Sequence, residues 1–137
     1  MLHNCNITLY NKIIEPDSTE KYRRTEIYDV FWEDKKGISS HRIGVDTDDL
    51  ATIIIWFESK CDKTFEKPKI WAKNNYPKHK FTLQPGDIII KNIVDGADEI
   101  ADFEKLERNY DDVLKISLVT TGDFGDETSQ HWQIGAN

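Results

Sequence analysis

The stretch Phe81-Thr82-Leu83-Gln84-Pro85-Gly86-Asp87-Ile88-Ile89-Ile90-Lys91 joins two apolar runs through a turn. Pro85 fixes φ at the second position of that turn, and Gly86 can take the positive φ that a type II turn requires at its third position. The β-branched run that follows is typical of a strand. We therefore expect strand-like backbone at 81–83, a turn at 84–87 and a strand at 88–91.

Strand patterns recur on both sides of this turn. Alternating apolar and polar residues predict strands at 6–15, 22–34, 38–45 and 129–135, and denser apolar runs predict strands at 51–58 and 113–120. We expect the strand at 51–58 to be buried on both faces. Turn-forming residues separate the strands, among them Pro16-Asp17-Ser18-Thr19, Asp34-Lys35-Lys36-Gly37 and Asp46-Thr47-Asp48-Asp49. The pattern predicts a mainly β chain, folded as a small antiparallel β-barrel or sandwich.

The only segment in which we expect a helix lies at about residues 102–110. Phe103, Leu106 and Tyr110 fall on one helical face, and Asp102 is placed to cap the first turn. Glu104 and Arg108 have the spacing of a favourable ion pair. We expect this short α-helix to plug or cover one open end of the barrel or sandwich.

Residues 1–137 are expected to form a single β-rich domain, interrupted by an irregular loop at about 59–80. This loop contains two prolines and many lysines, and long irregular segments in small domains tend to be functional or mobile. Phe65, Trp71 and Tyr76 lie in it and are candidate partner-docking residues, because aromatic side chains make effective interface anchors. The alternative is that the three aromatics pack onto the barrel as a lid.

Charge and hydropathy exclude several classes of function. The formal net charge is −7, so the chain repels phosphate backbones and general nucleic-acid binding is not expected. The longest apolar run, at 53–57, is far shorter than a membrane span, and the first residues do not have the pattern of a signal peptide. We therefore expect no membrane partner, and we expect synthesis and residence in the cytoplasm.

No motif predicts a catalytic, cofactor or metal site, and we do not expect an enzyme. Gly122-Asp123-Phe124-Gly125 contains the letters of the kinase magnesium loop, but the chain lacks the other kinase motifs. The acidic clusters Asp46/Asp48/Asp49 and Asp123/Asp126/Glu127 do not match a calcium loop, and histidines 3, 41, 79 and 131 lack zinc-binding spacing. His41 and His131 lie on predicted strands, where ordinary half-exposed histidines are expected. Cys5 and Cys61 are typical of reduced thiols, although a disulfide between them is an alternative.

One series of segments carries a family resemblance. The series comprises Ile7-Thr8-Leu9-Tyr10-Asn11, residues 28–32, the stretch at 81–91, Tyr110-Asp111-Asp112-Val113, Ile116-Ser117-Leu118-Val119, Asp123-Phe124-Gly125 and His131-Trp132-Gln133-Ile134-Gly135. It resembles an uncharacterised family of small proteins encoded by phages and prophages of Gram-positive bacteria, among genes for head and tail structure. The Pro-Gly-Asp turn, the central helix and the last two strands are similar, more distantly, to head-completion (stopper) and head–tail connector proteins.

The resemblance implies a small β-barrel that joins rings beneath the phage portal. Its expected partners are neighbouring copies of itself in a ring and another phage structural protein on the portal, adaptor or tail side. It would be in the host cytoplasm during assembly and in the virion afterwards. The N-terminal half is longer than in connector proteins, so a minor capsid or tail-completion role is a closely related alternative. Two functions of a different class compete with it: a prophage-encoded regulatory or host-interaction protein that is absent from the virion, and a small cytoplasmic enzyme.

Overall fold

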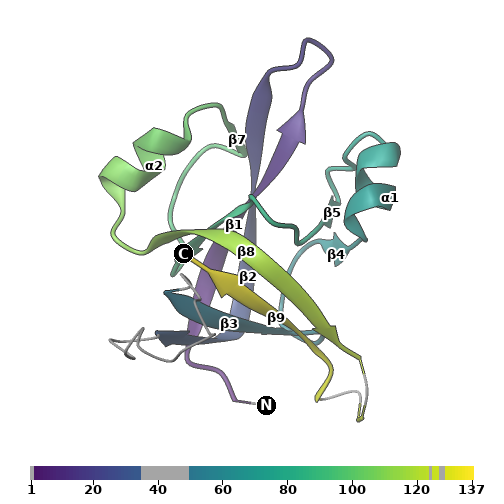
Figure 1. The fold of residues 1–137 in the computed structure, drawn as a ribbon, viewed down its shortest axis with the longest axis vertical. Helices are drawn as coiled ribbons and strands as arrows, with labels where there is room; N and C mark the ends of the chain where they lie inside the picture. The colour runs from purple at the N-terminus through teal and green to yellow at the C-terminus, as the bar shows by residue number, and fades with distance from the viewer. Residues whose placement is uncertain (1, 35–49, 124, 127–128) are drawn as a thin grey trace, which may run out of the picture.

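The computed structural model describes residues 2–34, 50–123, 125–126 and 129–137. Six antiparallel strands close a barrel in the order β1-β6-β8-β9-β3-β2, and pairing of β2 with β1 completes the circle (Figure 1). These strands are β1 (Cys5–Ile14), β2 (Glu20–Asp34), β3 (Ala51–Trp56), β6 (Ile88–Lys91), β8 (Val113–Gly122) and β9 (His131–Ala136). The barrel prediction is therefore confirmed. The predicted turn at 35–37, strand at 38–45 and polar break at 46–49 lie outside the described residues.

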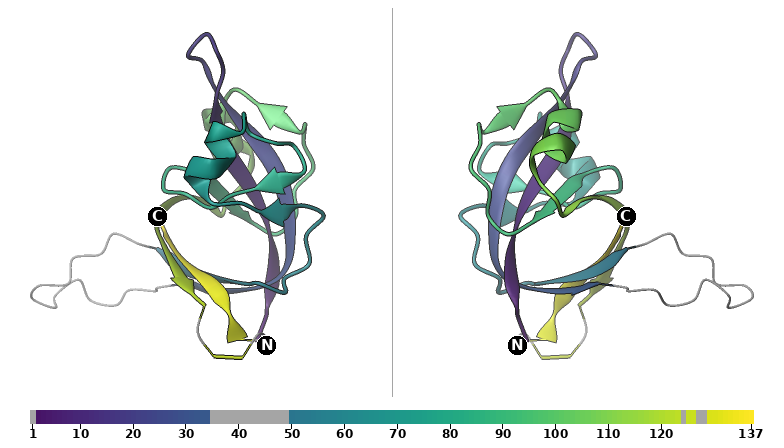
Figure 2. Two further views of the ribbon diagram at one scale, coloured as in Figure 1. Left: turned by 90° about the vertical axis from the view of Figure 1, so that its right-hand side faces the viewer. Right: turned by 90° about the vertical axis from the view of Figure 1, so that its left-hand side faces the viewer.

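The remaining elements are short and lie around the barrel. Strands β4 (Thr64–Phe65) and β5 (Lys80–Phe81) pair in parallel, and β7 (Glu99–Ile100) pairs with the start of β2. Two helices, α1 (Pro68–Lys73) and α2 (Phe103–Asn109), flank the β1–β2 hairpin on opposite sides (Figures 1 and 2). Neither is long and apolar enough to cross a membrane.

Helix α1 and the β4–β5 pair correct the prediction of an irregular loop at 59–80 and of a single helix. Pro68 occupies the first turn of α1, where a missing N–H does no harm. The preceding residue, Lys67, supplies no side-chain cap, and the first turn contains no acidic residue. These usual start signals of a helix are absent from the sequence, so α1 depends on the packing of its buried Trp71.

Helix α2 has the predicted cap and the predicted buried face, but it covers a different surface. The Glu104 N–H donates to Asp102 Oδ1 at 3.0 Å, and Arg108 pairs with Asp102 at 3.6 Å. Leu106 packs with Tyr10, Tyr22, Ile88 and Ile90, while the alternate residues Leu9 and Ile89 belong to the barrel interior. Because successive residues of a strand point to opposite faces, α2 covers the outside of β1 and β6 rather than an open end.

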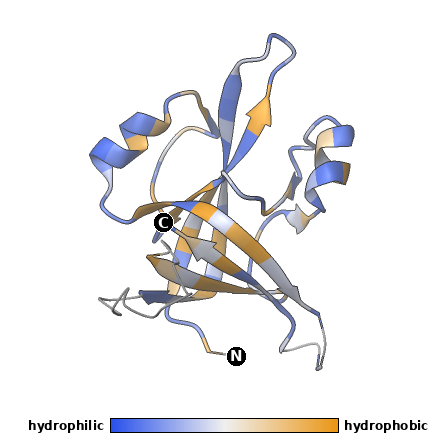
Figure 3. Cartoon of the chain, viewed as in Figure 1, coloured by the Kyte–Doolittle hydropathy of each residue, from blue (hydrophilic) through white to orange (hydrophobic). Residues whose placement is uncertain are grey.

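The strand that is buried on both faces is therefore β6 and not β3. Residues 88–90 are all buried, since the barrel core lies on one side of β6 and α2 on the other. In β3 the buried residues Ala51, Ile53 and Ile55 alternate with half-buried ones, which corrects the prediction for 51–58. In Figure 3 the barrel strands carry most of the hydrophobic colouring, and α2 is largely hydrophilic on its outer side.

A β-bulge at Asp29 lies near the point where β2 stops pairing with β1 and begins pairing with β3. The inward-facing residues change from odd positions (Thr25, Ile27) to even positions (Val30, Trp32) at this point, so both sequence faces of β2 contain core residues. Asp29 has a φ of 59°, and its N–H donates to Asn6 Oδ1 at 3.0 Å while its carbonyl accepts from Ser59 Oγ at 3.0 Å. Such bulges bend strands. Strand β2 pairs with β1 as far as Val30, and from Phe31 onward it pairs with β3.

The predicted turn at 84–87 is confirmed and anchors a buried carboxyl group. The Asp87 N–H donates to the Gln84 carbonyl at 3.2 Å, and Gly86 has a φ of 95°. The Asp87 side chain accepts the Lys12 N–H at 2.8 Å and the Asn11 side-chain amide at 2.7 Å, so the turn is tied to β1. Burial raises the pKa of Asp87 to about 7, although these hydrogen bonds oppose the increase.

We predict that Asp87 makes the protein more stable in mild acid. Its ordinary pKa is 3.8, so at intermediate pH the folded state holds a proton that the unfolded state has lost. The free energy of unfolding should therefore fall by up to about 1.4 kcal/mol per pH unit as the pH rises from about 5 to 7. Urea unfolding across this range measures the slope. Asp87→Asn removes the titrating group and should flatten the profile whatever its absolute stability; a flat wild-type profile would contradict the prediction.

We also predict that position 29 rejects β-branched residues. Asp29→Val places a branched side chain at positive φ and should lower the free energy of unfolding by about 1–3 kcal/mol. Asp29→Gly is the matched control, because glycine adopts this backbone without strain, and it should stay within about 0.5 kcal/mol of wild type. Equal losses in the two variants would show that the side chain, and not the backbone conformation, matters there.

Candidate functional site

The structure does not bring the three candidate docking residues together on the surface. Trp71 is 0% exposed, and its indole packs edge-on against Tyr76 with ring centroids 4.9 Å apart. Phe65 instead packs against Phe81 and Trp132 at the margin of the barrel core. This placement agrees with the alternative that these aromatics pack onto the barrel as a lid. Their docking role stays a prediction, and Trp71 could serve it only after a rearrangement of α1.

An open hollow does lie beside α1, formed mainly by other residues. This apolar groove has a volume of about 860 Å³ and lies between α1 and the β8–β9 part of the barrel. Ile70 and Phe57 stand in its walls and are 45% and 36% exposed. The complete lining is Phe57, Phe65, Lys67, Pro68, Lys69, Ile70, Leu83, Pro85, Val119, Thr121, Asp123 and Trp132. Exposed apolar surface in a concave setting is typical of a site that another molecule covers.

One side of the apolar groove is an unpaired strand edge. Strand β6 pairs with β8 only at 113–115, and Ile116 exchanges backbone hydrogen bonds with Gly86 and Asp87. From Leu118 to Gly122, β9 is the only described strand that pairs with β8. In an antiparallel ladder half of the backbone groups point away from the one neighbour, so this edge offers donors and acceptors to an added strand.

The sequence held only a weak signal for this surface. Ile70 lies between Lys69 and Trp71 in a segment without a helix pattern, so the sequence did not predict its exposure. Val119 looked like an ordinary residue of a paired strand. The free edge of β8 arises because β6 has four residues and β8 has ten, and this difference acts only when the two strands are aligned in register.

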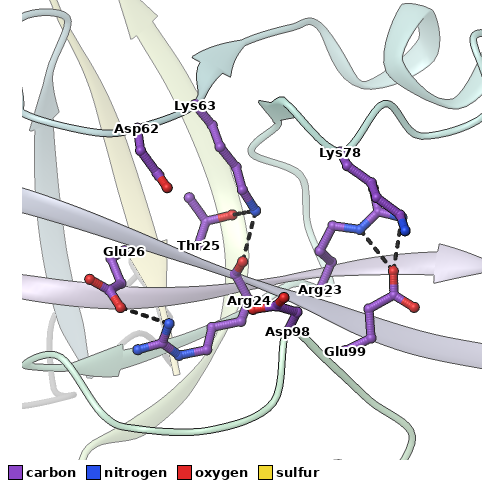
Figure 4. Close-up of a pocket in the computed structure, with 9 residues that line it drawn as sticks. All are labelled: Arg23, Arg24, Thr25, Glu26, Asp62, Lys63, Lys78, Asp98 and Glu99. Carbon is purple, nitrogen blue, oxygen red and sulfur yellow. Dashed lines mark hydrogen bonds and ion pairs between the residues drawn. The ribbon is translucent and has the colours of Figure 1, made fainter.

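A second hollow, of about 520 Å³, is lined by charged side chains from β2, β7 and the segments around 62, 78 and 98 (Figure 4). Arg23 pairs with Glu99 at 3.0 Å, and Arg24 pairs with Glu26 at 2.7 Å. Lys63 Nζ donates to the Arg24 carbonyl at 2.8 Å and to Thr25 Oγ1 at 2.9 Å, and burial lowers its pKa.

The charged side chains of this pocket are best explained as contacts that stabilise the fold. Its lining contains Arg23, Arg24, Lys63 and Lys78 against Glu26, Asp62, Asp98 and Glu99, so the formal charges cancel. The Arg23–Glu99 pair joins β7 to β2, and Arg23 also donates to the Tyr76 carbonyl. The arrangement therefore holds β7 and the end of the α1 segment against β2, and it does not present a nucleophile beside a base.

The remaining candidate residues are dispersed. Within the described residues, no group of three or more His, Cys, Asp or Glu side chains could hold a metal ion. Asp123 lies at the apolar groove, and Asp126 accepts the Ser129 N–H through its carbonyl. His131 packs edge-on against Trp56 at 5.5 Å. The acidic cluster at 46–49, His41, Phe124 and Glu127 lie outside the described residues, so the motifs that include them are not tested.

Both cysteines are free, half-buried thiols. Burial raises the pKa of the Cys5 thiol and of the Cys61 thiol. A raised pKa keeps a thiol protonated and weakly nucleophilic, because the thiolate is the reactive form. Neither residue is therefore activated for covalent chemistry.

A family model matches residues 2–137, and its description is a family of unknown function (DUF6751). The chain belongs to this family. No curated protein and no solved structure matches the chain. The family description assigns no activity to DUF6751.

We predict that Trp71 and Ile70 differ sharply in their effect on stability. Trp71→Ala removes a fully buried ring and should lower the free energy of unfolding by about 3–5 kcal/mol. Ile70→Ala, the control on the same helix, changes a half-exposed side chain and should lower it by about 1 kcal/mol or less. Urea unfolding followed by circular dichroism distinguishes them. A nearly neutral Trp71→Ala would restore Trp71 as a candidate docking residue.

Proposed function

We propose that this protein is a phage virion assembly protein, a head–tail connector or other neck or minor structural component that acts through protein–protein contacts. Its partners would be neighbouring copies of itself in a ring and another phage structural protein on the portal, adaptor or tail side. It would work in the host cytoplasm during assembly and remain in the virion. The resemblance to phage structural-module proteins motivates the phage setting.

The observation that carries the proposal is the apolar groove with its free β8 edge. The exposed Ile70 and Phe57 supply apolar contact area, and the edge from Leu118 to Gly122 supplies backbone hydrogen bonds. Addition of a strand to such an edge is a common mode of protein recognition, in which backbone pairing gives affinity and side-chain pockets give specificity. The charged pocket offers less to a ligand, since three of its basic groups, Arg23, Arg24 and Lys63, already have partners.

Two measurements on the phage that encodes the protein test the proposal. Mass spectrometry of purified virions should detect the chain in every preparation, because a structural component stays in the particle. Absence from the virion would contradict the proposal and favour a regulatory or host-interaction protein.

Complementation with variants tests the role of the apolar groove. In a phage that lacks the gene, Ile70→Glu should reduce the yield of infectious particles by about tenfold or more, because a charge in the groove wall opposes apolar contact. Leu50→Glu is the matched control, since Leu50 is 58% exposed, directly precedes β3 and does not line the groove. Electron micrographs of the Ile70→Glu lysate should show heads without tails. Equal yields from the two variants would exclude the groove as the assembly surface.

A further inference from the structure

The β1–β2 hairpin extends beyond the barrel as an arm. Strand β1 pairs with β6 only over residues 7–10, and β2 pairs with β7 only at Tyr22 and Arg23. Ile13 and Ile14 pair with Lys21 and Glu20 across the hairpin, and residues 15–19 form its tip. The hairpin arm (residues 13–21) therefore has outer edges that no described strand pairs, and it projects from one end of the molecule (Figures 1 and 2).

The tip of the hairpin arm is apolar and acidic. Ile14 is 54% exposed. Between Ile14 and Glu20 the acidic residues are Glu15, Asp17 and Glu20, and none is basic. Lys12 pairs with Glu20 and Lys21 pairs with Glu15 next to the tip, but these pairs are solvent-exposed and contribute little.

The apolar groove has the opposite charge. Helix α1 and the residue before it contain Lys67, Lys69 and Lys73 and no acidic residue. Lys67 and Lys69 border the groove, where they outnumber its one acidic lining residue, Asp123. This basic face occurs on a chain with a net charge of −7. An acidic apolar strand is thus a better electrostatic match for the groove than a neutral or basic one.

We propose that the apolar groove of one copy receives the hairpin arm of the next copy. An outer edge of the arm would extend the sheet along the free edge of β8, Ile14 would lie against Ile70 and Phe57, and the acidic tip would face Lys67 and Lys69. The occupant is a second copy because the tip of the arm extends beyond α1 and away from β8 of its own chain (Figure 1). This inference rests on the proposed function and names the contact between neighbours in the ring.

The proposed contact is heterologous, because an arm meets a groove. After one such contact the pair of copies retains one unused groove on the first copy and one unused arm on the second. Such contacts build rings when the rotation closes and open filaments when it does not. Loss of the arm in one copy and loss of the groove in another should therefore have effects that can be measured separately.

The test measures self-association of the full chain by analytical ultracentrifugation from about 10 μM to about 1 mM, the range in which weak contacts become visible. Wild type should form oligomers that grow with concentration and dissociate in high salt. Ile14→Glu, which disables the arm, and Ile70→Glu, which disables the groove, should each weaken association by about tenfold or more. An equimolar mixture of the two should form dimers and nothing larger, because one intact groove and one intact arm remain.

Leu50→Glu is the control and should associate as wild type does. Circular dichroism checks that each variant is folded. We expect folded variants because each substitution is at an exposed side chain. Wild type that stays monomeric throughout the range, Ile14→Glu that associates normally, or a mixture that stays monomeric would each overturn the inference. If Ile70→Glu blocks head–tail joining while Ile14→Glu does not, the groove binds a different ring protein, and the proposed function stands without the arm contact.

Discussion

The barrel depends on the bend of β2 at Asp29. Strand β2 has fifteen residues and pairs with β1 as far as Val30 and with β3 from Phe31 onward, so the bend lies where its pairing changes from one strand to the other. The positive φ of Asp29 exchanges the inner and outer faces of β2, so that Ile27 and Val30 both point into one core. The Asn6 and Ser59 side chains bind the two backbone groups of Asp29, and they satisfy the polar atoms that the bulge removes from the ladder.

The strands of this closed barrel differ in length. The four-residue β6 lies between the ten-residue strands β1 and β8, so each of these extends past it at one end. The excess of β1, together with the start of β2, forms the hairpin arm. The excess of β8 forms the free edge of the apolar groove. The difference in length between β6 and its two neighbours thus produces both surfaces to which we assign a function. Helix α2 covers the apolar residues on the outer face of β6.

Local signals in the sequence predicted the elements that local chemistry determines. The Pro85-Gly86 turn and the cap of α2 at Asp102 fall in this class, because each needs only a few adjacent residues. Helix α1 was missed since it depends on the burial of Trp71, which none of the usual start signals of a helix indicates. The bulge left a trace, as large apolar residues occupy both faces of the segment around Tyr28, but nothing local distinguished a bulge from a strand covered on both sides. The apolar groove depends on the register of β6 against β8, which no single segment encodes.

Unpaired edges normally invite indiscriminate pairing, and the charges on the two surfaces restrict it here. Two hairpin arms brought edge to edge would juxtapose Glu15, Asp17 and Glu20 with their own copies. Two grooves would oppose Lys67 and Lys69 in the same way. Like charges placed directly opposite each other destabilise strand pairing, whereas opposite charges favour it. Arm against groove is the combination in which the free edges, the exposed isoleucines and the charges all agree, so the same residues that support association also set its direction.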